Sequence, residues 1–394
     1  MQPIPYHPYS NSFNANPHPV YKRMRDEAPA FFVEDINAWA LSRFDDVWEA
    51  SMDRGNYTAT QGTHLDALVM NAPTPRAFVF MDPPEHRQYR NLVNPSYSSE
   101  AVKPLESKVR ELTRTLMRQH LERGELEVYS LATKVGAHII ADIIGLRRPD
   151  MDIIRGFLDI YFGREKGVIG PTPSGLQAYA ELEKFALDLV REYRRNPPPD
   201  STHLHAWMNT PVNGKLMTDE EVFFTIFSLA VTGSDTLALT SAGTVYYLYE
   251  RPQLLASVRD DRSLIPLAFA ETARFDQPTN VLGRKVIRNV KLHGQTLQVG
   301  QSVLFLFASA CRDEREYENP DEYHILRTSK RTLAFGAGIH ACLGKHLALL
   351  EGKVILEEIL AAIPDFELHR DQCQRQFGEF LQGYCRVPIR FSPR

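Results

Sequence analysis

The chain has 394 residues, of which 43% are hydrophobic, and its 45 Lys and Arg against 49 Asp and Glu give a formal net charge of −4. This composition is typical of a soluble globular protein, and the scattered basic residues lack the stripe expected of a nucleic-acid-binding protein. Its four cysteines form no CxxC pair, so the sequence predicts neither a disulfide framework nor a zinc or iron–sulfur site.

The N-terminal region is expected to hold an irregular lead-in followed by a small hairpin. The first residues lack a basic segment followed by an apolar run, so we expect no signal peptide or membrane anchor and a cytoplasmic protein. Two short apolar runs, residues 30–33 and 38–41, flank the polar residues 34–37, which predicts a β-hairpin. Residues 55–80 show no regular pattern, and irregular segments of this length are often functional.

Helical periodicity dominates from Pro84 to about residue 250, and short apolar runs such as residues 291–297 and 303–307 predict strands beyond residue 280. The Pro-rich stretch at residues 197–200 is the best linker candidate, but it is too short to establish a domain boundary. We therefore expect one large domain over residues 1–394, mainly α with a minor β component (α+β).

A long central helix is predicted between Thr218 and about Glu250. Thr218 and Glu221 form a capping-box pattern at its start. The segment from residue 222 to 249 is long enough to span a bilayer, but its many Ser, Thr and Gly residues and the central acid Asp235 favour a helix buried inside protein. Asp235 is followed by Thr236, and a carboxylate beside a hydroxyl can carry protons into a buried site. The alternative is an aspartate held in an ion pair, beside hydroxyls that bond only their own backbone.

Two charged pairs stand at helical spacing elsewhere in the chain. His86 and Arg90 lie one turn apart on one helix face, and Glu271 and Arg274 are separated by three residues. Taken alone, each pair is typical of a solvated helix surface and contributes little to stability.

The most specific pattern lies near the C-terminus, where Phe335, Gly336, Gly338, His340, Cys342 and Gly344 form the sequence FGxGxHxCxG. Glycines at this density let the backbone turn tightly and approach a flat partner, and the loop presents one thiolate before an amphipathic helical run. A lone buried cysteine is usually an inert small hydrophobe, so the residue on its own would indicate little.

The full pattern resembles the haem-binding loop of the cytochrome P450 family at every fixed position. The resemblance covers nearly the whole chain and implies a single large cytochrome P450-like domain with a long central helix and small sheets. It implies that haem b is the cofactor, with Cys342 as the axial thiolate ligand of the iron, a ligand that favours O–O cleavage.

The same resemblance implies roles for residues outside the cysteine loop. His86, Arg90, Arg284 and His340 would hold the haem propionates, and Asp235 and Thr236 would deliver protons. Glu271 and Arg274, with Arg327 as a third member, would form a buried structural network. The chain departs from the common family pattern at Thr232, Leu237, Cys311, Glu314 and Leu349.

Segments that face the substrate in this family are mostly apolar here, which implies a small hydrophobic substrate. The residues expected in this pocket are Leu65, Val69, Met70, Leu229, Ala230, Thr232, Gly233, Asn280, Val281 and Tyr384.

The sequence therefore predicts a monomeric monooxygenase that uses O2 to hydroxylate this substrate. Electrons would come from a separate ferredoxin and its reductase, docking near Arg87, Lys345, His346 and Lys353. One alternative is a haem-thiolate enzyme driven directly by peroxide, against which the acid–alcohol pair argues because such an enzyme needs no proton relay. The other is a non-catalytic haem sensor or carrier, which would normally couple to an output module.

Overall fold

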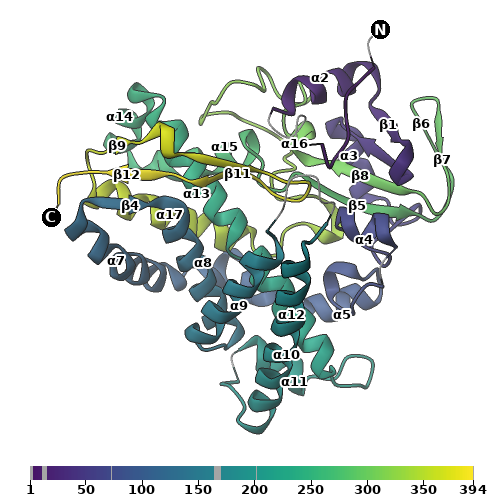
Figure 1. Cartoon of the computed structure of the whole chain (residues 1–394), viewed down its shortest axis with the longest axis horizontal. Coiled ribbons are helices and arrows are strands. Elements are labelled where there is room, and N and C mark those ends of the chain that lie inside the picture. Colours follow the sequence, from purple (N-terminus) through teal and green to yellow (C-terminus); the bar gives the residue numbers. More distant parts are fainter. Residues whose placement is uncertain (1–2, 11–15, 72, 164–169, 201, 394) are drawn as a thin grey trace.

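The computed structural model describes residues 3–10, 16–71, 73–163, 170–200 and 202–393. Helices dominate the part of the chain that it describes (Figure 1). They are α2 (His18–Glu27), α3 (Phe44–Met52), α4 (Leu65–Met70), α5 (Glu85–Asn91), α6 (Ser99–Val102), α7 (Leu105–Arg123), α8 (Val128–Ile144), α9 (Arg148–Tyr161), α10 (Pro173–Arg195), α11 (His203–Asn209), α12 (Asp219–Thr232), α13 (Asp235–Tyr249), α14 (Pro252–Asp260), α15 (Ile265–Phe275), α16 (Phe307–Ala310) and α17 (Lys345–Ala362).

The strands are short and form small sheets, as expected for a minor β component. They are β1 (Ala30–Val33), β2 (Ala38–Leu41), β3 (Tyr57–Thr58), β4 (Glu125–Glu127), β5 (Val281–Val286), β6 (Val290–Leu292), β7 (Gln295–Leu297), β8 (Ser302–Leu306), β9 (Glu367–Leu368), β10 (Gln374–Phe377), β11 (Gln382–Arg386) and β12 (Pro388–Arg390). The predicted fold class, mainly α with small sheets, is confirmed.

The largest sheet joins the three N-terminal strands to β5 and β8, in the order β1-β2-β8-β5-β3. β1 and β2 form the predicted hairpin, with Ala30 opposite Leu41, and β8 joins β2 in parallel. The segment 291–297, predicted as a strand, forms most of a second hairpin, in which β6 pairs with β7. In Figure 1 this sheet lies with α2, α3 and α4 on one side of the molecule, and the longer helices fill the other side.

The central helix begins where the capping box predicts, because the Thr218 hydroxyl accepts from the Glu221 amide and the Glu221 carboxylate accepts from the Thr218 amide. The predicted long helix runs to Tyr249, but the chain departs from helical angles at Ser234, which divides it into α12 and α13. Hydroxyls contribute to this break: Thr232 donates to the carbonyl of Ser228 at 2.8 Å, a bond that bends helices.

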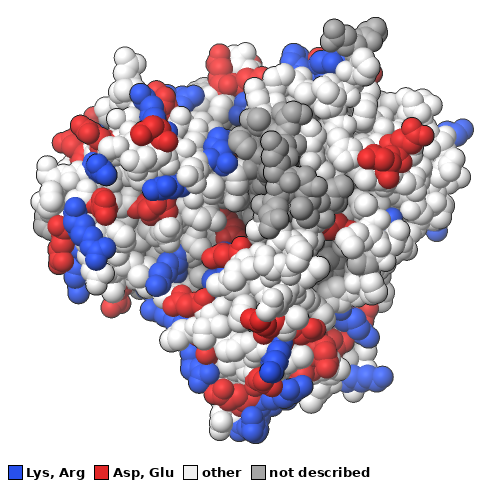
Figure 2. Space-filling model, in the orientation of Figure 1, with Lys and Arg blue, Asp and Glu red and all other residues white. Residues whose placement is uncertain are grey.

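The α12–α13 segment is the core of the helical part. By length and composition, residues 219–249 could cross a membrane, yet 72% of their most apolar window is buried within the fold. α13 contacts α8, α15, α17 and β11, so it has protein neighbours on several sides. On the face drawn in Figure 2, the described acidic and basic side chains are interspersed, in keeping with the small net charge.

Candidate haem site

The cysteine loop is held in one conformation by its own backbone. The Cys342 amide donates to the carbonyl of Phe335 at 2.8 Å, and Gly336 and Gly338 have φ of 67° and 71°, which side chains rarely adopt. A Cβ on Gly338 would overlap the carbonyl oxygen of Ser51 in α3, so only glycine lets the loop approach that helix. The loop ends at Gly344, where α17 begins.

The thiol of Cys342 is exposed on this loop. Although Cys342 keeps accessible surface, the protein atoms packed around it partly desolvate the sulfur and raise the pKa of the thiol, while a hydrogen bond from the Gly344 amide and the charges of Arg90 and Lys345 act in the opposite direction. These three groups favour the thiolate, the form that binds a metal.

Arg90 ties α5 to the cysteine loop. Its guanidinium donates to the carbonyls of Ile339 and Ala341 at 2.6 Å, on either side of His340. Burial lowers the pKa of Arg90, and the charge of Cys342 opposes that shift. Arg90 therefore connects two segments that are about 250 residues apart in the chain.

Three further groups predicted to face the propionates lie together, and no described carboxylate bonds any of them, although Asp82 acts on His86 and Arg284 through its charge. The rings of His86 and His340 are 4.6 Å apart, and neither Nε2 has a hydrogen-bond partner among the described residues. Arg284 pairs with no carboxylate in the described part of the chain and donates only to the carbonyl of Gly283, at 2.6 Å. Burial and the positive neighbours lower the pKa of His86 to about 4, and burial lowers that of Arg284 to about 10. Buried cations and unpaired donors of this kind fit a ligand that carries carboxylates.

Asp235 is buried at the start of α13 and is paired with Arg155 of α9. The two guanidinium–carboxylate distances are 2.8 and 3.1 Å, and Arg155 also reaches the exposed Asp159 at 2.6 Å. Burial raises the pKa of Asp235, and Arg155 opposes that shift. This is the ion pair that the sequence left open as an alternative. The described partners of the Asp235 carboxylate are both on Arg155, and the Thr236 hydroxyl bonds only the Thr232 carbonyl, so no direct hydrogen bond joins the acid to the alcohol.

Thr236 and Thr232 lie one turn apart on the α12–α13 segment. Thr236 is half-buried and makes only a long 3.4 Å contact with the Thr232 carbonyl, while Thr232 is exposed. Both hydroxyls therefore stand on an accessible strip of an otherwise buried helix. Gly233, between them, faces Ile140 of α8, where a Cβ would clash. The glycine is thus explained by close packing of the two helices.

The predicted charged network forms on α15. Arg274 donates to both carboxylate oxygens of Glu271, at 2.7 and 2.8 Å, and each side chain is 4% exposed. Arg327 reaches the same carboxylate at 3.4 Å, and the amide of His324 donates to it at 2.9 Å. The network joins α15 to the irregular segment that leads to the cysteine loop.

Most residues expected in the substrate pocket are packed in the protein interior. Leu65 and Val281 lie with Val69 at the core on one face of the large sheet, Leu229 and Ala230 lie in the helical core, and Met70 is 71% exposed. Two of the expected residues have specific partners within the protein. The Asn280 side chain accepts from the Tyr21 hydroxyl at 2.7 Å and donates to the Gly378 carbonyl at 3.0 Å. Tyr384 stacks on Tyr246 at 4.0 Å.

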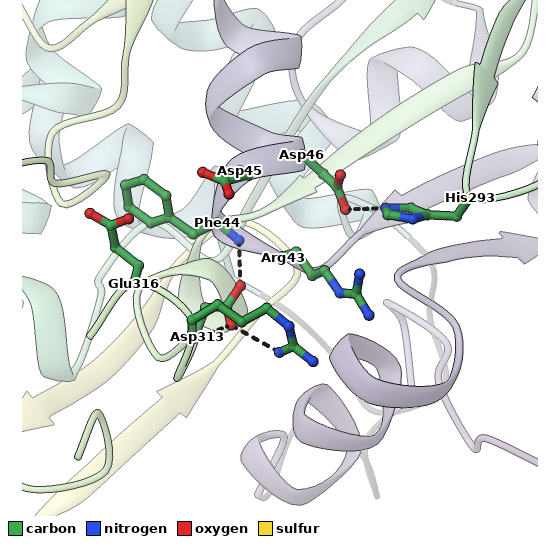
Figure 3. Close-up of a pocket in the computed structure, with 8 residues that line it drawn as sticks. Arg43, Phe44, Asp45, Asp46, His293, Asp313 and Glu316 are labelled. Carbon is green, nitrogen blue, oxygen red and sulfur yellow. Dashed lines mark hydrogen bonds and ion pairs between the residues drawn. The ribbon is translucent and has the colours of Figure 1, made fainter. Parts of the chain in front are cut away.

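A polar depression elsewhere on the molecule is occupied by structural contacts. Figure 3 shows Asp313 accepting from the Phe44 amide and Asp46 bonded to His293, at 2.8 Å in each case. These bonds join α3 to the segment after α16 and to the β6–β7 turn, so the depression serves as a junction between elements.

Comparison with known proteins identifies the family to which the chain belongs. A family model described as Cytochrome P450 matches residues 166–379. The putative cytochrome P450 123 of Mycobacterium tuberculosis is 32% identical over 391 residues, which cover 98% of this chain and 97% of that protein. The chain belongs to the cytochrome P450 family. Cytochrome P450 109 of Bacillus spizizenii, 26% identical, covers 95% of this chain and 92% of its own length. The structure of CYP109E1 from Bacillus megaterium in complex with corticosterone has a TM-score of 0.82 and 26% identity, over 97% of this chain and 100% of that one.

Membership of the cytochrome P450 family makes the protein a haem-dependent monooxygenase. The residues present fit this cofactor. Haem carries two propionates, and His86, His340 and Arg284 are donors or cations that lack an anionic partner among the described residues. The thiol of Cys342 is accessible beside them on a glycine-shaped loop.

Proposed function

We propose that the protein hydroxylates a small hydrophobic substrate, with Cys342 as the axial ligand of haem b. The observation that carries this proposal is an accessible cysteine, Cys342, on the same loop as His340, whose ring lies 4.6 Å from that of His86, with neither Nε2 bonded by a described residue. Haem, when bound, supplies the activation of dioxygen. The protein's part is to hold the cofactor, deliver protons and bind the substrate.

The propionates would be bound by Arg284, His86 and His340, which have free hydrogen-bonding capacity. Arg90 is less available to bind a propionate, because both of its terminal nitrogens already bond the cysteine loop. It would fix the position of the loop and contribute positive charge beside the thiolate. Phe335, Gly336 and Gly344 would shape the loop around the sulfur.

Protons would reach the site through Asp235 and Thr236. The Asp235 carboxylate is bound by Arg155, whose other partner, Asp159, is 66% exposed. Rotation of Arg155 toward Asp159 would release the Asp235 carboxylate, which burial then disposes to take up a proton. Thr236 would take part by accepting a hydrogen bond and passing on its own proton, and its long 3.4 Å contact with the Thr232 carbonyl supports this because it leaves the hydroxyl weakly held.

Electrons would come from a ferredoxin-type donor docking beside the cysteine loop. Arg87 and Lys345 are exposed there and form no ion pair among the described residues, and His346 is exposed next to Lys345. Lys353 is less suited to this role than the sequence suggested, because its ammonium is 3.3 Å from Glu106 and 3.8 Å from Glu357. A docking surface of few free charges favours a weak, transient complex.

We also propose that the enzyme works as a cytoplasmic monomer on an apolar compound. Burial of the most membrane-like segment supports a location away from the bilayer. A structural relative binds corticosterone, which supports an apolar substrate of some size.

Substitution of Cys342 by Ser tests the proposal directly. We expect Cys342→Ser to lose the red-shifted absorbance that a thiolate ligand gives the reduced carbon monoxide complex. Cys373→Ser, at a half-buried cysteine outside the loop, is the control and should keep that spectrum. A thiolate spectrum that survives Cys342→Ser would refute the ligand assignment.

A further inference from the structure

Four aromatic rings from four separate segments meet near β5. His64 precedes α4, Phe80 ends a 3₁₀ turn (Phe78–Phe80), Phe162 follows α9, and Phe380 lies in the turn between β10 and β11. The ring of His64 is 4.6 Å from Phe380 in an edge-to-face arrangement and 6.0 Å from Phe80, and Phe162 is 6.2 Å from Phe380. All four side chains are half-buried, so the cluster keeps accessible surface.

Backbone bonds place this aromatic cluster beside the haem site. The carbonyl of Thr63, next to His64, accepts from the Gly283 amide at 2.8 Å, and the carbonyl of Phe380 accepts from the Asn280 amide at 2.8 Å. Both segments are therefore anchored to the start of β5, which carries Arg284. The charge of Arg284 also acts on the His64 ring. The cluster thus adjoins a residue assigned to a propionate.

His64 is the one polar ring in the aromatic cluster. Its Nδ1 makes a long 3.4 Å contact with the Thr63 hydroxyl, and no described residue bonds its Nε2. Burial first, and then Arg284, lower the pKa of His64 to about 4, so the imidazole is neutral at pH 7. A neutral imidazole can donate or accept one hydrogen bond at its free nitrogen.

We propose that the aromatic cluster recognises a flat aromatic compound with one uncharged hydroxyl or carbonyl group, which bonds Nε2 of His64. This inference rests on the proposed function, because the compound would be the substrate. Aromatic rings prefer edge-to-face and offset-stacked arrangements. The four rings should therefore bind a flat aromatic compound more tightly than a saturated compound of the same apolar area. The polar group is uncharged because His64 is neutral and Arg284 is assigned to the haem.

Calorimetric titration of the holoenzyme with three probes tests the inference: 2-naphthol, naphthalene and decahydro-2-naphthol. The wild type should bind 2-naphthol about fivefold more tightly than naphthalene, the effect of one neutral hydrogen bond. His64→Phe should keep naphthalene binding and abolish that preference. Phe380→Leu should weaken both aromatic probes about fivefold while changing decahydro-2-naphthol little.

The matched control is Phe366→Leu, which truncates an aromatic ring stacked on Tyr249 outside the cluster, and it should leave all three affinities unchanged. The inference is overturned if the aromatic probes do not bind, if the saturated probe binds as tightly as 2-naphthol, or if His64→Phe keeps the wild-type preference. The titration needs neither reductant nor oxygen. Selective binding without hydroxylation would therefore uphold the recognition site and count against the proposed monooxygenase reaction on such compounds.

Discussion

Replacing Arg274 should show how strongly burial changes the contribution of an ion pair to the free energy of unfolding. The guanidinium makes two bonds to Glu271, two of 2.9 Å to the carbonyls of Cys311 and Pro320, and a longer one of 3.3 Å to the carbonyl of Glu322. Arg274→Ala removes all of them and leaves the Glu271 carboxylate 4% exposed, with only the His324 amide and the 3.4 Å contact to Arg327. Stranding one charge of a buried pair costs about 3–5 kcal/mol, so we expect a loss of that size in the free energy of unfolding.

The chain offers a closely matched control on α6. Glu100 and Lys103 have the same spacing of three residues and the same 2.7 Å separation as the buried pair, but their side chains are 78% and 67% exposed. Lys103→Ala should therefore cost less than about 1 kcal/mol, the usual worth of a surface pair. Only burial and the added partners of Arg274 separate the two cases.

Urea unfolding followed by far-UV circular dichroism measures both losses, and haem absorbance reports retention of the cofactor. Arg274→Lys keeps the charge but not the two-pronged bond, and it should cost about 1.5–3 kcal/mol, so it serves if Arg274→Ala does not fold. Losses below about 1 kcal/mol for both Arg274 variants would refute the reasoning, because they would mean that burial adds nothing to this pair.

Three further predictions concern other parts of the site. Glu351 is buried in α17 and no described residue bonds its Oε1, so burial raises its pKa well above the usual range. The folded state then favours the neutral acid, so the free energy of unfolding should fall as the pH rises above about 4.5. Urea unfolding at several pH values should show that Glu351→Gln removes this pH dependence and changes stability little at about pH 4. The same pH dependence in the variant and the wild type would contradict the assignment. Gly338→Ala should lower the free energy of unfolding by at least about 1–2 kcal/mol because of the positive φ, and should lose haem because the new Cβ would clash with Ser51. The control is Gly214→Ala, with φ of 76° and open space around it, which should show the backbone cost alone. Full haem retention in Gly338→Ala would contradict the packing. Arg155→Leu should raise the pKa of Asp235 further and move the pH profile of product formation to higher pH. The control, Arg148→Leu, breaks the ion pair between α9 and Asp142 and should leave the profile unchanged. An unmoved profile in Arg155→Leu would argue against the relay.

Short sequence patterns predicted the elements whose stabilising contacts join residues close in sequence. The β1–β2 hairpin depends on two short apolar runs on either side of a polar turn, and the start of α12 depends on two hydrogen bonds within Thr218–Glu221. The Glu271–Arg274 pair depends on one helical turn. The cysteine loop was also readable, because its glycines are required by backbone angles that few other residues adopt. In each case the deciding interaction spans only a few residues.

Contacts between distant segments were decided only by the tertiary structure. Arg155 reaches Asp235 across 80 residues, and no sequence pattern marks one as the partner of the other. The same holds for the Asn280 side chain, which Tyr21 engages across 259 residues, and for Lys353, which Glu106 neutralises. The aromatic cluster around His64 joins four segments that converge only after the helices pack. Sequence alone therefore determined the family, the cofactor and the haem loop. Packing decided which charges are paired and which side chains stay accessible, because those outcomes depend on neighbours that the folded chain brings together.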